Sequence, residues 1–291
     1  MRSLLVAVIL CGVAHAQMFN STVDQVAVPV TIHSERNEPV IDLRPDDFRV
    51  FDDGRPVAIV AFGRIRQSVH VLLLLDTSRS MMQSLSEVRA AANAVIARLG
   101  PDDSVQIGTF SSSLRLSPPL SADDNQLAAR LPLVPGANMT SLYDVLVEGC
   151  GVFTSGMDRR AIFVVSDGTD TSSSASARSV MERAAETNVA IYAVGLSSRH
   201  LERGKPIVRA PDSTLRQIAE DTGGRYVYAG TGRDLSRVFA SMIEELHQQY
   251  MLGFTPAHPD GRLHALTVTT GRPNMKIRAR KHYLAPSPRR D

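Results

Sequence analysis

The chain has 291 residues, of which 43% are hydrophobic and 5% aromatic, and its formal net charge is +2 at pH 7. This length supports one sizeable core with a smaller module beside it, and it argues against one core that includes every residue. The near-neutral charge argues against nucleic acid as the main partner.

The N-terminus has the pattern of a cleavable export signal. Arg2 supplies a positive charge, Leu4 to Val13 form an apolar run, and Ala14-His15-Ala16 has the small residues of a cleavage site. We therefore expect residues 1–16 to be removed and the protein to be periplasmic or secreted. Removal takes away Cys11, so Cys150 remains as the single cysteine, for which a core position is expected. No later apolar run approaches the roughly 20 residues of a membrane span, so no transmembrane segment is expected in the mature chain.

Residues 17–66 are predicted to form an N-terminal β segment. Short β-like stretches cover Val26 to Ile32, Phe48 to Phe51 and Val57 to Phe62. The residues Asp52-Asp53-Gly54 between the last two are typical of a hairpin turn.

Residues 67–248 alternate between two kinds of segment. Short apolar runs predict strands that are buried on both faces, at Val69 to Leu75, Val105 to Phe110, Ala161 to Val165 and Val189 to Val194. Helical patterns follow them, at Leu85 to Leu99, Leu142 to Phe153, Ser176 to Glu186, Ser213 to Asp221 and Leu235 to Gln248. Alternating strands and helices predict an α/β fold with a doubly wound, mostly parallel sheet flanked by helices.

Residues 249–284 return to the β pattern, at Tyr250 to Phe254, Leu263 to Thr270 and Met275 to Tyr283. Neither end of the chain has enough strands to be stable alone, so we expect both ends to pair into one small antiparallel module. On the last segment Lys276, Arg278 and Arg280 share one face; it could contact anionic envelope polymers, although a solvated face is favoured. Residues 285–291 are predicted to be a flexible tail.

Oxygen-bearing side chains follow two of the predicted strands. The first strand ends in Asp76-Thr77-Ser78-Arg79-Ser80, and the third in Ser166-Asp167. Ligands of an open parallel sheet bind beyond the carboxyl ends of its strands, and Thr140, just before a predicted helix, can reach the same edge. A site made only of oxygen ligands suits a hard cation such as Mg²⁺, or Mn²⁺ or Ca²⁺ in its place.

This order of residues, Asp76-x-Ser78-x-Ser80 followed by Thr140 and Asp167, resembles the metal-ion-dependent adhesion site of von Willebrand factor type A domains. The resemblance covers about Val69 to Gln248. It implies that Ser78 and Ser80 bind the cation directly, that Thr140 binds directly or through water, and that the two aspartates act mainly through water. It also implies a protein partner that completes the coordination with an exposed Asp or Glu. The chain is then an exported adhesion or scaffold domain and no enzyme.

The flanking stretches Pro39 to Leu43, Asp46 to Pro56 and Tyr250 to Phe254 resemble those of a bacterial, acidobacterial-type subfamily of exported type A-related proteins. Two alternatives stay open. The domain can be a structural subunit of an envelope complex that uses no metal. It can also be a hydrolase similar to aspartic proteases, because Asp76-Thr77-Ser78 and Asp221-Thr222-Gly223 are similar to their paired motifs. The predicted helices disfavour that mostly β fold.

Overall fold

The structure is a computed structural model. It describes residues 25–64, 68–120, 136, 139–153, 159–167, 170–202, 205–209, 213–230 and 234–287. The predicted export signal, residues 1–16, lies outside the described residues, and so does the end of the predicted tail, residues 288–291.

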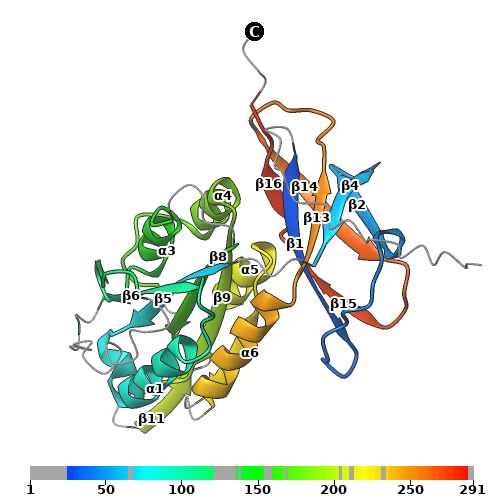
Figure 1. Ribbon diagram of the computed structural model, residues 1–291. Helices are drawn as coiled ribbons and strands as arrows, with labels where there is room; N and C mark the ends of the chain where they lie inside the picture. The colour runs from blue at the N-terminus through cyan, green and yellow to red at the C-terminus, as the bar shows by residue number, and fades with distance from the viewer. Residues whose placement is uncertain are drawn as a thin grey trace, which may run out of the picture.

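A six-stranded sheet forms the centre of the larger part of the molecule (Figure 1), and its strand order is β12-β9-β8-β5-β6-β7. Four of the neighbouring pairs are parallel, and only the edge strand β7 pairs antiparallel, with β6. The strands are β5 (Val69–Asp76), β6 (Ser104–Phe110), β7 (Leu114–Leu116), β8 (Arg159–Ser166), β9 (Val189–Leu196) and β12 (Tyr226–Gly230).

Helices cover both faces of this sheet. They are α1 (Leu85–Ile96), α3 (Leu142–Cys150), α4 (Ala177–Thr187), α5 (Ser213–Asp221) and α6 (Leu235–His247), and a 3₁₀ helix, η2 (Arg79–Ser84), precedes α1. Leu73 and Leu75 of β5 pack in a core with α1 and α6, whereas Leu72 and Leu74 pack in a second core with α3, α4 and α5. Successive strand residues point to opposite faces, so a continuous apolar run serves both cores. The predicted α/β fold with a mostly parallel sheet is confirmed.

The two ends of the chain form two four-stranded antiparallel sheets beside the larger part (Figure 1). One has the order β15-β1-β13-β4 and the other β16-β14-β2-β3. The strands are β1 (Val26–Ser34), β2 (Phe48–Asp52), β3 (Arg55–Val57), β4 (Ile59–Gly63), β13 (Tyr250–Phe254), β14 (Leu263–Thr270), β15 (Met275–Arg278) and β16 (His282–Leu284), and η1 (Pro45–Asp47) is a 3₁₀ turn. β1 pairs with β13 and β15, and β2 pairs with β14, so each sheet joins both ends of the chain.

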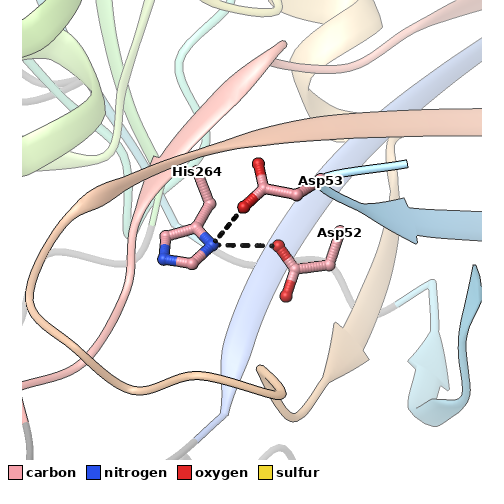
Figure 2. A group of neighbouring side chains, drawn as sticks. All are labelled: Asp52, Asp53 and His264. Atoms are coloured by element: carbon pink, nitrogen blue, oxygen red, sulfur yellow. Dashed lines mark ion pairs between the residues drawn. The ribbon is translucent and has the colours of Figure 1, made fainter. Parts of the chain in front are cut away.

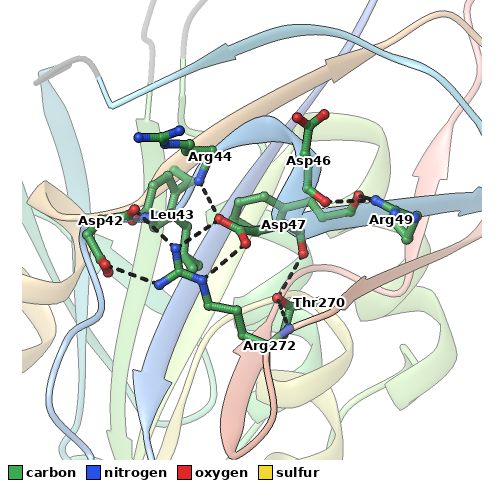
Figure 3. A network of polar contacts seen from close by, with 10 residues as sticks. Asp42, Leu43, Arg44, Asp46, Asp47, Arg49, Thr270 and Arg272 are labelled. Atoms are coloured by element: carbon green, nitrogen blue, oxygen red, sulfur yellow. Dashed lines mark hydrogen bonds and ion pairs between the residues drawn. The ribbon is translucent and has the colours of Figure 1, made fainter.

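An arginine secures the segment between β1 and β2 (Figure 3). The guanidinium of Arg272 contacts the carboxylates of Asp42 and Asp47, each at 3.1 Å, and the other oxygen of Asp47 accepts the backbone N–H of Arg44 at 2.7 Å. In addition, the hydroxyl of Tyr250 accepts the backbone N–H of Leu43 at 3.0 Å. The contacts attach the N-terminal segment to residues more than 200 positions later in the chain.

Several elements differ from the predictions. The segment Met275 to Tyr283 is two strands, β15 and β16, in different sheets. The strands β7 and β12 were not predicted, and neither were the two strands of a separate hairpin, β10 (Ser198–Glu202) and β11 (Lys205–Arg209). These strands form sheet edges or a separate ribbon, so they lack the long apolar run that marks a strand covered on both faces.

The expectation of a solvated basic face on the last strand segment is wrong for two of its three residues. Arg278 contacts the carboxylate of Glu245 on α6 at 3.2 Å. Arg280 donates to the backbone carbonyl of Ala27 at 2.7 Å and to the side chain of Asn188. These two arginines are half-buried because the antiparallel sheets pack against α6 and the C-terminal end of α4, which the local sequence does not encode.

Candidate metal centre

The carboxyl ends of β5, β6 and β8 meet at one edge of the parallel sheet. Asp76, the last residue of β5, lies opposite Phe110, the last residue of β6. On the other side, Leu75 lies opposite Val165 near the end of β8. Residues that follow any of these strands therefore lie at the same edge, as the strand endings predicted.

Asp76 is completely buried at this edge. Its Oδ1 accepts the backbone N–H of Ser78 at 2.8 Å, and its Oδ2 accepts the hydroxyl of Ser166 at 2.6 Å. Burial raises the pKa of the Asp76 carboxyl to about 6; the hydrogen bonds from Ser166 and Ser78 oppose the rise, and the charge of Asp167 adds to it. Because both oxygens already accept hydrogen bonds from the protein, this carboxylate suits contact with a cation through water.

Two hydroxyls stand beside Asp76 in the loop before α1. The Oγ atoms of Ser78 and Ser80 are 3.1 Å apart. Neighbouring ligands of an octahedral Mg²⁺ with bonds of about 2.1 Å lie about 3.0 Å apart, so this spacing fits a pair of direct ligands. Thr77 between the aspartate and the serines turns inward, where its hydroxyl donates to the carbonyl of Phe110 at 3.0 Å and so fixes the loop to β6.

Thr140 lies on the neighbouring loop, 4% exposed. Its backbone N–H donates to the hydroxyl of Thr171 at 2.8 Å, and its carbonyl accepts the backbone N–H of Thr171 at 2.9 Å. The next residue, Ser141, donates its N–H to the carbonyl of Ser111, directly after β6, at 2.8 Å. Gly136 donates to the carbonyl of Thr77 at 2.7 Å. These bonds hold the Thr140 loop against the loop that follows β6 and against the loop of Ser78 and Ser80 that follows β5.

Asp167 follows directly after β8 and is 3% exposed. Its charge acts on Asp76 across the edge. The structure therefore gathers Asp76, Ser78 and Asp167 at one edge with Thr140 on the adjoining loop, and Ser80 is within contact of Ser78.

Residues 170–175 support this edge through hydrogen bonds to α3. Asp144 on α3 accepts the backbone N–H groups of Ser174 at 3.0 Å and Ala175 at 2.7 Å. The hydroxyl of Ser173 in turn accepts the N–H of Tyr143 at 3.0 Å. Asp144, in the first turn of α3, therefore holds the loop that fixes Thr140.

The second aspartate of the protease-like pair lies elsewhere. Asp221 ends α5, contacts Lys281 at 2.6 Å, and is followed by Thr222, whose hydroxyl accepts the backbone N–H of Ile191 at 3.0 Å. Ile191 is near the start of β9, whereas Asp76 is at the end of the parallel strand β5. Asp76 therefore lies at the carboxyl ends of the parallel strands and Asp221 near their amino ends, so the two carboxyl groups cannot share a proton.

A second group of side chains that could bind a metal lies in the β module, which is the pair of four-stranded antiparallel sheets formed by the two ends of the chain. One atom each of Asp52, Asp53 and His264 lie within 4.8 Å of one another (Figure 2). The sequence gives no local sign of this group, because His264 is more than 200 positions away from the two aspartates. The one available signal was the Asp52-Asp53 pair at a predicted hairpin turn.

None of the described helices combines the length and apolar character needed to cross a membrane.

Several solved structures are similar to this one. The von Willebrand factor type A protein from Catenulispora acidiphila matches with a TM-score of 0.52 and 13% identity, over 91% of this chain and 75% of that one. An aerotolerance-related membrane protein from Bacteroides fragilis matches with a TM-score of 0.50 and 16% identity, over 61% of this chain and 100% of that one.

Proximal thread matrix protein 1 from the mussel byssus, with a zinc-occupied MIDAS motif, matches with a TM-score of 0.52 and 16% identity, over 69% of this chain and 50% of that one. At these low identities, the structural likeness shows a shared fold alone. No curated protein matches the sequence. A family model of the von Willebrand factor type A domain matches residues 70–241, which include the whole sheet edge described above. The chain therefore belongs to the von Willebrand factor type A domain family.

Proposed function

We propose that this protein is an exported, divalent-cation-dependent protein-binding domain that captures an acidic residue of a partner at the edge of its parallel sheet. The observation that carries the proposal is the pair of hydroxyls on Ser78 and Ser80, 3.1 Å apart beside the buried carboxylate of Asp76. The cation is Mg²⁺, or Mn²⁺ or Ca²⁺ in its place. The related fold from the mussel byssus has a zinc-occupied MIDAS motif, which supports a divalent ion at such an edge.

The charges at the site explain why a carboxylate is the expected partner group. Ser78 and Ser80 would hold the cation directly, Thr140 directly or through water, and Asp76 and Asp167 through water. With neutral hydroxyls as direct ligands, a bound cation supplies a Lewis-acidic position that a partner's Asp or Glu can occupy. The residues of this chain contribute orientation: Ser166 holds one oxygen of Asp76, and the Thr171 contacts hold Thr140.

Export is proposed from the N-terminal pattern of Arg2, the apolar run Leu4 to Val13 and the small residues Ala14-His15-Ala16. It is consistent with the structural likeness to an aerotolerance-related membrane protein. Secretion and periplasmic retention both follow from such a signal.

Calorimetric titration of Mg²⁺, then Mn²⁺, into the full chain tests the site. We expect binding in the wild type, and loss of binding in Asp76→Ala and in Ser78→Ala with Ser80→Ala. The matched control is Asp102→Ala, which removes a carboxylate from an exposed position. Unchanged Mg²⁺ binding by a folded Asp76→Ala variant would contradict the assignment of the site.

A second titration tests the partner chemistry. A peptide with one exposed Glu is added with Mg²⁺ or with a chelator, beside the same peptide with Gln. Binding that requires both Glu and Mg²⁺ supports the proposal. Equal binding of both peptides, or binding of the Glu peptide that the chelator leaves unchanged, favours the alternative of a structural subunit that uses no metal.

A further inference from the structure

The group formed by Asp52, Asp53 and His264 lies in the β module, away from the edge of the parallel sheet. Asp52 ends β2, Asp53 is the first turn residue after it, and His264 is on β14. The antiparallel pairing of β14 with β2, in which Leu266 lies opposite Asp52, brings them together. In Figure 2 both carboxylates point toward the same imidazole nitrogen, with Nδ1 of His264 at 2.9 Å from Oδ2 of Asp53 and 3.3 Å from Oδ1 of Asp52.

The imidazole nitrogen that faces the carboxylates makes no hydrogen bond. The side chain of His264 is only 7% exposed, and its Nδ1 is buried without a hydrogen-bond partner although two carboxylate oxygens are this close. Neither oxygen therefore lies along the direction in which an N–H on Nδ1 would point. A buried nitrogen in this position needs a ligand other than these two oxygens alone.

The distances between the groups fit a shared metal ion. Ligands of a tetrahedral Zn²⁺ with bonds of about 2.0–2.2 Å lie about 3.3 Å apart, and the two nitrogen-to-oxygen distances here are 2.9 Å and 3.3 Å. One imidazole nitrogen with two carboxylate oxygens is a donor set for Zn²⁺, whereas Mg²⁺ prefers oxygen alone. Two carboxylates beside a neutral imidazole also balance a dication. Asp53 is 56% exposed at its side chain, so an ion has a route from solvent.

Outer contacts hold each of the three groups in place. The other ring nitrogen of His264, Nε2, is 3.0 Å from Oδ1 of Asp260, the carboxylate contact that metal-binding histidines usually make. The hydroxyl of Tyr283 donates to Asp52 at 2.9 Å. The backbone N–H of Ala265 donates to Oδ1 of Asp53 at 2.8 Å and leaves Oδ2 directed at the imidazole.

We propose that Asp52, Asp53 and His264 form a second metal site, for Zn²⁺ or a similar transition-metal ion, which ties the β2–β3 turn to β14. The competing occupant is a proton on Nδ1, which would make an imidazolium paired with the two carboxylates. A metal and a proton differ in an experiment, because only the metal is removed by a chelator.

The test is calorimetric titration of Zn²⁺ into the full chain with Asp76→Ala, a change that removes the carboxylate of the competing site at the sheet edge. We expect about one Zn²⁺ per chain and no response to Mg²⁺. Adding His264→Gln should weaken Zn²⁺ binding by more than about 100-fold, and adding Asp53→Asn by more than about 10-fold. His258→Gln, an exposed histidine nearby in the chain, is the matched control and should change nothing.

Asp53→Asn guards against misfolding, because asparagine accepts the positive φ of 46° at this position and can still accept the Ala265 N–H. Zn²⁺ should also raise the thermal midpoint of the Asp76→Ala chain, and this rise should vanish with His264→Gln. The metal site is overturned, and the imidazolium remains, if the Asp76→Ala chain binds no Zn²⁺. The same conclusion follows if adding His264→Gln or Asp53→Asn leaves the Zn²⁺ affinity of that chain unchanged. This outcome is independent of Mg²⁺ binding by the wild type at Asp76.

Discussion

Acid should weaken the attachment between the β module and the larger part of the molecule through His33. This histidine on β1 is 5% exposed, and its Nδ1 accepts from the guanidinium of Arg278 at 3.3 Å. Burial first, then the positive charges of Arg278, Arg225 and Lys276, lower the pKa of His33 from 6.5 to about 4. Glu245 is the carboxylate that pairs with Arg225 and Arg278 there, and its charge does not restore the pKa of His33.

The sign follows from the direction of the shift. The folded state keeps His33 neutral, whereas the unfolded chain binds a proton below pH 6.5. Stability is therefore fully present above pH 6.5 and falls as the pH drops toward 4. A difference of about 2.5 pKa units corresponds to about 3 kcal/mol lost across that window.

Urea denaturation followed by circular dichroism, at about pH 7 and about pH 4, measures this loss. Other groups also titrate in this range, so the relevant quantity is the difference between variants. His33→Gln keeps an oxygen that can accept from Arg278 but binds no proton. We expect its free energy of unfolding to fall by about 3 kcal/mol less than that of the wild type. His258→Gln, at an exposed position, should behave like the wild type. Equal acid losses in the His33→Gln chain and the wild type would refute the reasoning.

Two substitutions and one labelling experiment test the sheet edge and the core. Ser166→Ala removes the 2.6 Å hydrogen bond to Asp76, so we expect a loss of about 1–3 kcal/mol in urea denaturation and weaker Mg²⁺ binding by calorimetry. Gly224→Ala puts a Cβ 2.0 Å from the carbonyl oxygen of Ile191, a backbone atom, so we expect at least about 1–3 kcal/mol of destabilisation and a lower thermal midpoint. Burial raises the pKa of the Cys150 thiol to about 12, so a thiol reagent should label it only after unfolding in urea.

Each of these has its own check. Gly271→Ala meets nothing within 4 Å and should change stability by less than about 1 kcal/mol, so a Gly224→Ala chain of equal stability contradicts the close approach. Wild-type stability and Mg²⁺ affinity in Ser166→Ala would show that Asp76 needs no such contact. Rapid labelling of Cys150 in the native protein would contradict its burial.

The central sheet was predictable because its strands are covered on both faces. β5 and β8 are built on continuous apolar runs, and the structure extends the predicted strands by one residue for β5 and three for β8. The edge strand β12 was not predicted, because its residues are mostly half-exposed and its apolar run, Tyr226 to Ala229, is short. Tyr250 to Phe254 was predicted to the residue, since all five positions are buried.

The candidate site divides in the same way. Asp76, Ser78 and Asp167 follow strand ends, and parallel strands bring such positions to one edge whatever the loops do. The anchoring of Thr140 by Thr171, and of that loop by Asp144, depends on how two loops meet and has no local signature.

The sequence by itself determined the helices, the four buried strands of the central sheet, the family motif and the edge where its oxygens gather, because burial on two faces and the carboxyl ends of strands are properties of neighbouring residues. Only the tertiary structure decided that Arg278 pairs with Glu245, and that His264 meets Asp52 and Asp53. The physical reason is that antiparallel pairing between the two ends sets these contacts, and a register of one residue more or less would turn the same side chains to the other face.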